Sequence, residues 1–153
     1  MKPVDVAGRI GPNAIIQTTA AMRERLGDTQ AAALLHQATG RGLHDMPEAM
    51  IAEREVEALM GAVISALPRE ESEALLREAG HRTGAYLLAH RIPAPARAII
   101  RLLPRRLGAA LLLRAMSQHA WTFAGTGAFS HRGTRDIIFT VAACPLCRSA
   151  PRG

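Results

Sequence analysis

Apolar residues recur with the 3.6-residue period of an α-helix from about residue 12 to about residue 120. Proline and glycine divide this pattern into segments. Pro12, for example, suits the first position of a helix, and Gly27 ends the run that it begins. The pattern predicts helices over residues 12–26, 29–39, 53–67, 69–91, 96–103 and 105–120, with a loop over residues 41–47. Gly80 and Gly84 share one side of the fourth helix, where another element could approach closely.

The period changes from 3.6 to 2 after residue 120. Over residues 121–129 the odd positions are aromatic or glycine and the even positions are small, which predicts a strand. Residues 130–134 are typical of a turn, and residues 136–142 form a second alternating run. We therefore expect an α+β fold that is predominantly α-helical, with helices to about residue 120 followed by an antiparallel β-hairpin. A length of 153 residues fits a single domain.

Composition and charge limit the classes of function. No stretch reaches the roughly 20 apolar residues of a transmembrane helix, and the N-terminus lacks a secretory signal, so we expect a cytoplasmic protein. The net charge of +6 suits an acidic small ligand, an anionic membrane surface or nucleic acid, or only a solvated helical surface. We expect no nucleic-acid partner, because the few aromatic residues lie in an apolar strand and no known nucleic-acid motif is present.

Several short segments occur in a distinctive order over residues 8–148, namely Gly8–Ala14, Ala79–Ala89, Arg91–Pro93, His119–Phe123 and Cys144–Arg148. Together they resemble the bacteriochlorophyll 4-vinyl reductase family. The resemblance implies a role in bacteriochlorophyll synthesis, on tetrapyrrole intermediates that carry a vinyl group at C8 (ring position 4), and a fold of helices and antiparallel strands. It leaves open whether the chain reduces the vinyl group or carries the pigment. Family members continue past the equivalent of Arg148, so we expect a C-terminally short version of that domain.

The resemblance gives the strand over residues 121–129 a candidate role. Trp121, Phe123 and Phe129 point to one side of it, and Gly125 and Gly127 leave gaps without side chains between them. A flat macrocycle could lie there against bare backbone, edged by aromatic rings. The alternative is that helices cover this face and that the glycines permit close packing or a bulge.

Three further groups of residues are candidates for the same ligand. His119 could coordinate the magnesium of a bound tetrapyrrole, although a hydrogen-bonded core histidine is the alternative. Arg97 and Arg101 lie four residues apart and suit a pigment propionate, or else a solvated basic face. Cys144 and Cys147 have half the spacing of a zinc site, and free thiols are the alternative.

No redox cofactor site is evident in the sequence. The segment 125–127 has two glycines of a dinucleotide-binding motif but not the third, and two cysteines cannot hold an iron–sulfur cluster. We therefore favour a tetrapyrrole carrier or accessory protein for C8 vinyl reduction. The alternatives are a 4-vinyl reductase that uses an external electron donor and a small-molecule sensor domain. The candidate partners are the pigment intermediate, other pigment-synthesis enzymes and a second copy of the chain.

Overall fold

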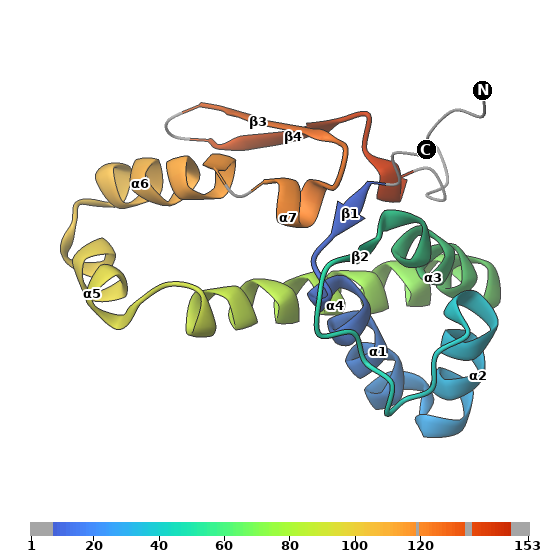
Figure 1. Ribbon diagram of the computed structural model, residues 1–153. Coiled ribbons are helices and arrows are strands. Elements are labelled where there is room, and N and C mark those ends of the chain that lie inside the picture. The colour runs from blue at the N-terminus through green and yellow to red at the C-terminus, as the bar shows by residue number, and fades with distance from the viewer. Residues whose placement is uncertain (1–7, 119, 134–135, 148–153) are drawn as a thin grey trace.

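The computed structural model describes residues 8–118, 120–133 and 136–147 of the chain (Figure 1). In chain order its elements are β1 (Arg9–Ile10), α1 (Asn13–Leu26), α2 (Asp28–Thr39), β2 (Ile51–Ala52), α3 (Glu53–Ala66), α4 (Arg69–His90), α5 (Ala94–Leu102), α6 (Arg105–Gln118), α7 (Trp121–Ala124), β3 (Ala128–Arg132), β4 (Ile138–Ala142) and the 3₁₀ turn η1 (Pro145–Cys147). The strands form two antiparallel pairs. The predicted class, α+β and predominantly α-helical, is confirmed.

The predicted helices agree with the observed ones to within two residues at each end. Backbone chemistry explains this accuracy. Gly27 separates α1 from α2 with φ at 81°, and Gly40 ends α2 in the left-handed conformation, where its N–H donates to the carbonyl oxygen of His36 at 2.8 Å. Pro68 and Pro93 stand just before α4 and α5, because proline cannot continue the preceding helix.

The core lies among α1, α2, α3 and the first half of α4. Its most deeply buried apolar side chains are Ile10, Ile15, Met22, Leu35, Val56, Leu59, Val63 and Leu75. Strand β1 pairs with β2, which places Ile10 opposite Ile51 at the edge of this core. The sequence analysis did not predict this pair, because two residues are too few to show a period.

Helix α4 leaves the core halfway along its length. Its buried residues, Ser72, Leu75 and Ala79, all belong to its first half. The second half continues away from α1–α3 to α5, and α6 then runs back toward the hairpin (Figure 1). We call residues 80–118 the arm. No residue of α5 is buried, and no helix in the described ranges is long and apolar enough to cross a bilayer.

The predicted hairpin exists, but its first strand begins later than expected. Residues 121–124, predicted as strand, form the short helix α7, and β3 starts only at Ala128. The predicted turn over residues 130–134 was also misplaced, because β3 continues to Arg132. Four alternating residues cannot distinguish a strand from one helical turn. Gly125, with φ at 58°, then provides the sharp change of direction between α7 and β3.

Candidate functional site

Where α4, α5 and α6 meet, a place that we call the elbow of the arm, the three helices line an open hollow of about 430 Å³. It is lined by Ala85, Leu88 and Ala89 of α4, Ile92 of the linker, Arg97, Ile100 and Arg101 of α5, and Leu112 of α6. Six of these eight side chains are aliphatic. The other two are Arg97 and Arg101, which the sequence analysis selected for binding a carboxylate. Small-molecule sites typically have this make-up, with apolar walls and a few polar groups, and volumes of roughly 300–1,000 Å³.

Arg97 holds the start of α5 against the end of α4. Its Nη1 donates hydrogen bonds to the carbonyl oxygens of Leu88, at 3.3 Å, and Ala89, at 3.2 Å. Carbonyls in the last turn of a helix have no partner within the helix, so a guanidinium is a favourable cap there. Arg97 therefore both joins α5 to α4 and places positive charge at the hollow.

Gly108 lets α5 and α6 pack closely against each other. A Cβ atom on this residue would lie 3.1 Å from the carbonyl oxygen of Ile100, so the two helices approach closely only because no side chain intervenes. The N–H of Gly108 also donates to the carbonyl oxygen of Pro104 at 3.0 Å, within the turn that begins α6. The close approach brings Leu112, one turn further along α6, to the wall of the hollow.

The chemistry of the hollow suits an apolar ligand that carries a carboxylate. Arg101 is exposed and Arg97 is partly buried, and both side chains come from the same face of α5. A guanidinium offers several N–H donors and keeps its charge, so it can bind a carboxylate with two hydrogen bonds. The aliphatic walls would meanwhile cover the apolar part of the ligand.

Helix α7 and the hairpin together form a second, aromatic cluster beyond the far end of α6. The rings of Phe123 and Phe129 meet edge to face with centroids 5.3 Å apart, and Phe129 stacks on Phe139 at 5.8 Å. The structure thus brings together two of the three predicted aromatic residues. The backbone of Trp121 belongs to α7, and its side chain lies outside the described part of the structure.

The two glycines beside this cluster are closely packed. A Cβ atom on Gly125 would lie 2.5 Å from Oε2 of Glu53, and one on Gly127 would lie 2.9 Å from Cγ1 of Val141. In this structure a ligand would meet these neighbours rather than bare backbone. The close-packing alternative of the sequence analysis therefore describes the geometry at both glycines.

The cysteines form a disulfide. The Sγ atoms of Cys144 and Cys147 are 2.15 Å apart, so the free-thiol alternative of the sequence analysis is wrong for this structure. Sulfurs joined in this way are not thiolates, the form that binds zinc, and a metal role would require the reduced pair. No group of three or more His, Cys, Asp or Glu residues in the described ranges could hold a metal ion.

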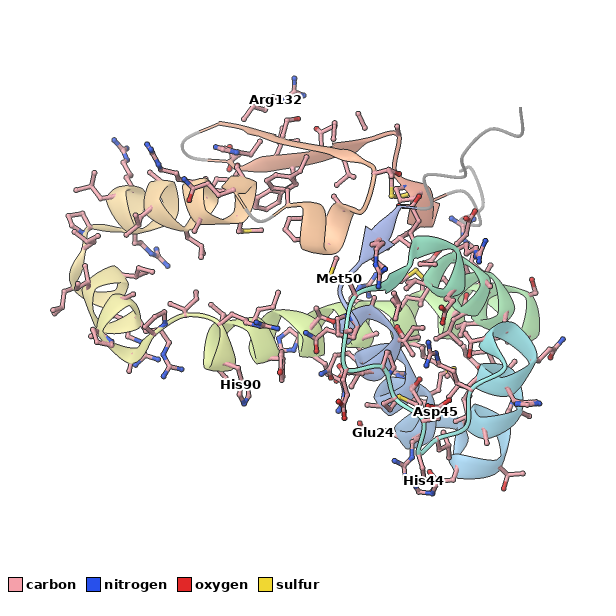
Figure 2. The ribbon with its side chains drawn as sticks, in the orientation of Figure 1. Glu24, His44, Asp45, Met50, His90 and Arg132 are labelled. Atoms are coloured by element: carbon pink, nitrogen blue, oxygen red, sulfur yellow. A yellow bond between two sulfur atoms is a disulfide. The ribbon has the colours of Figure 1, made fainter. Side chains whose placement is uncertain are left out.

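His119 lies outside the described residues, so its proposed role as a magnesium ligand stays a prediction. Two other histidines of this region are described. His90 stacks on Tyr86 with ring centroids 4.4 Å apart and points away from α6 (Figure 2). Nδ1 of His131 lies 3.4 Å from Oγ of Ser117, which joins β3 to the end of α6.

Sequence reasoning missed Glu53, which holds the hairpin against the core. Its carboxylate accepts hydrogen bonds from the backbone N–H and the hydroxyl of Thr126, each at 3.0 Å. The only sequence signal at Glu53 is a favourable acidic residue in the first turn of a helix, which does not indicate a distant partner.

Two curated proteins are similar to this chain over most of its length. The bacteriochlorophyll synthase 23 kDa chain of Cereibacter sphaeroides is 40% identical over 141 residues, which are 92% of this chain and 68% of that protein. The bacteriochlorophyll synthase 23 kDa chain of Rhodobacter capsulatus is 40% identical over 144 residues, which are 94% of this chain and 67% of that protein. No family model and no solved structure matches this chain.

Proposed function

The chain belongs to the family of the bacteriochlorophyll synthase 23 kDa chain, and on that premise we propose that it binds a tetrapyrrole intermediate of bacteriochlorophyll synthesis. The binding site is the hollow between α4, α5 and α6. The observation that carries the proposal is the combination of six aliphatic side chains with Arg97 and Arg101 around one concave surface. A tetrapyrrole of this pathway combines a flat, largely apolar ring with a propionate carboxylate, and these two parts match the two kinds of lining residue.

Within this pathway we propose a carrier or accessory role for reduction of the C8 vinyl group. Among the residues that the structure describes, the only polar side chains that line the hollow are arginines, and a guanidinium does not exchange protons near neutral pH. Such a lining favours holding a ligand over transferring a proton to it. A reductase that receives electrons from an external donor is the second candidate, which the resemblance described above leaves open.

A pigment titration tests the binding site. Absorbance and the fluorescence of Trp121, the single tryptophan, would report binding of a divinyl magnesium chlorin with a free propionate. We expect Arg101→Leu to weaken binding about tenfold or more, because a hydrogen bond to a charged group contributes roughly 1.5–3 kcal/mol. Arg106→Leu is the matched control, since Arg106 is exposed on the same arm but does not line the hollow.

The methyl ester of the same pigment sharpens the test. The ester should bind the unmodified chain more weakly than the free acid does, and Arg101→Leu should remove most of that difference. Equal affinity for acid and ester would contradict a carboxylate site at Arg101. Unchanged absorbance and Trp121 emission across a series of such pigments would contradict pigment binding itself.

An activity assay separates the carrier from the reductase. The chain, mixed with a divinyl chlorin and NADPH alone, should form no ethyl product, because hydride transfer needs a nicotinamide held about 3–3.5 Å from the vinyl carbon. Steady NADPH-dependent reduction by the purified chain, lost in His119→Ala, would replace the carrier proposal with an enzyme.

A further inference from the structure

The tip of the arm exposes large aliphatic side chains. Leu102 of α5 is 86% exposed and Leu107 of α6 is 57% exposed, and Ile99 and Leu111 are about half exposed. Arg105 and Arg106, at the start of α6, lie between them in sequence and are also exposed. We call these six residues the docking face. Single exposed aliphatic residues are common, but a group of four around one turn indicates a binding surface.

On α5, the aliphatic residues of the docking face point away from the two arginines that line the hollow. At 100° per residue, Ile99 points about 160° away from both Arg97 and Arg101, which line the hollow, whereas Leu102 points about 100° away from its neighbour Arg101. Arg97, Ile100 and Arg101 of this short helix therefore line the hollow, whereas Ile99 and Leu102 are exposed to solvent. Binding at this face requires neither the hollow nor a ligand in it, so it is independent of the proposed function.

Charge along the chain identifies the kind of partner that fits this face. Residues 1–78 carry twelve acidic and eight basic side chains, whereas residues 79–135 carry nine arginines and no acidic residue. Among the described residues, the ion pairs extend along the chain only as far as Arg82, which contacts Glu24 and Glu78 at the base of the arm. The described arginines beyond it face solvent, the hollow or backbone carbonyls. The tip is thus both apolar and strongly positive.

We propose that the docking face binds the surface of a bilayer that contains anionic phospholipids. The aliphatic side chains of Leu102 and Leu107 enter the boundary between headgroups and acyl chains, while Arg105 and Arg106 contact lipid phosphates. Interfacial segments have this combination of a basic and an apolar surface without the length to span a membrane. Each arginine near an anionic surface strengthens binding by about fivefold, and the gain falls with rising salt.

Vesicle sedimentation tests the proposal. The chain should sediment with vesicles of equal parts phosphatidylglycerol and phosphatidylcholine, and should not sediment with phosphatidylcholine alone. The variant Arg105→Gln/Arg106→Gln should bind about 25-fold more weakly, since two arginines each contribute about fivefold, and Leu102→Ser/Leu107→Ser should bind at least about tenfold more weakly. All four side chains are exposed, and circular dichroism would verify that the variants keep their helices.

A matched control separates the docking face from net charge. Arg25→Gln/Arg77→Gln removes the same two charges from exposed positions of α1 and of the first half of α4, and it should bind vesicles within twofold of the unmodified chain. If both arginine double variants lost vesicle binding to the same extent, the docking face would be overturned. Equal binding to both kinds of vesicle, or binding to neither, would overturn it as well. A dimer in sedimentation that Leu102→Ser/Leu107→Ser dissociates, without vesicle binding, would assign the face to a second copy of the chain and overturn the lipid proposal.

Discussion

Glu53 and Thr126 are 73 residues apart in sequence, yet the Glu53 carboxylate accepts both the backbone N–H and the hydroxyl of Thr126. Two glycines make room for this contact, since a Cβ atom on Gly8 or Gly125 would lie within 2.5 Å of Glu53 Oε2. Pro145 is fully buried nearby and Leu146 packs on the core. The hairpin is therefore attached to α3 at both of its ends.

Substitution of Glu53 should release the first of these attachments. We expect Glu53→Ala to lower the free energy of unfolding by about 1–3 kcal/mol, because it removes a charged acceptor from two donors. Thr126→Val keeps the backbone donor and should lower the free energy of unfolding by less than Glu53→Ala does. Urea denaturation gives the energies, and hydrogen exchange should accelerate in β3 and not in α1. Equal acceleration in both elements would contradict a local attachment.

Two glycines of the arm should respond to substitution with opposite signs. Gly108→Val places a side chain against the backbone of Ile100 and should lower the free energy of unfolding by about 1–3 kcal/mol. A Cβ atom on Gly84 would have no neighbour within 4 Å, so Gly84→Ala should raise that free energy by up to about 1 kcal/mol through helix propensity. Thermal denaturation of both variants measures the effect. A stabilising Gly108→Val would show that α5 and α6 are not in close contact.

The two arginines of the hollow should differ in their effect on stability. Arg97→Met removes the hydrogen bonds to the last carbonyls of α4 and should cost about 1 kcal/mol. Arg101→Met, which breaks no hydrogen bond in the described structure, should stay within about 0.5 kcal/mol of the unmodified chain. Chemical denaturation of the two variants gives their free energies of unfolding. A larger loss of stability in Arg101→Met than in Arg97→Met would contradict the capping role of Arg97.

Reduction of the disulfide should have a limited effect on stability. The bridge between Cys144 and Cys147 closes a loop of only four residues, and loop closure of that size contributes at most about 2 kcal/mol. We expect a reducing agent to lower the free energy of unfolding by no more than this amount. The variant Cys144→Ser/Cys147→Ser should not respond to the reductant, and a response from it would point to an effect elsewhere in the chain.

Asp28 should make stability depend on pH in the acid range. A hydrogen bond from Arg23, at 2.7 Å, lowers the pKa of the Asp28 carboxyl below its ordinary value of 3.8. A carboxyl with a lowered pKa in the folded state stabilises that state above the ordinary pKa, and this contribution is lost as the pH falls through the lowered pKa. The unmodified chain should therefore be more stable than Asp28→Asn at about pH 6, and the difference should narrow at about pH 2. A constant difference between these pH values would contradict the ion pair.

The helices were predictable because their boundaries are set by local chemistry. Gly27, Gly40, Pro68 and Pro93 end or begin helices through their own backbone preferences, which require no distant partner. Features that join remote residues could not be predicted in this way. The pairing of Ile10 with Ile51 and the contact of Glu53 with Thr126 depend on how the finished helices pack.

In the candidate site, too, the local features were predictable from the sequence and the contacts between distant residues were not. The four-residue spacing of Arg97 and Arg101 predicted that they share a face of one helix, and the structure places both at the hollow. The partners on α4 and α6 could not be predicted, because Leu88 and Leu112 have the same helical spacing as ordinary core residues. For the cysteines, only a metal site and free thiols were expected from the sequence, and the positions of the two sulfurs show a disulfide instead.

The length of helix α4 also sets the distance between the core and the hollow. About eleven of its residues lie beyond Ala79, the last that is buried, and at 1.5 Å per residue they hold the elbow about 16 Å beyond the core. Because a helix turns by about 100° per residue, a single inserted residue would redirect the whole elbow, whereas a whole extra turn would move it outward by about 5.4 Å and nearly restore its orientation. The distance from the hollow to the core is therefore adjustable only in whole turns of α4.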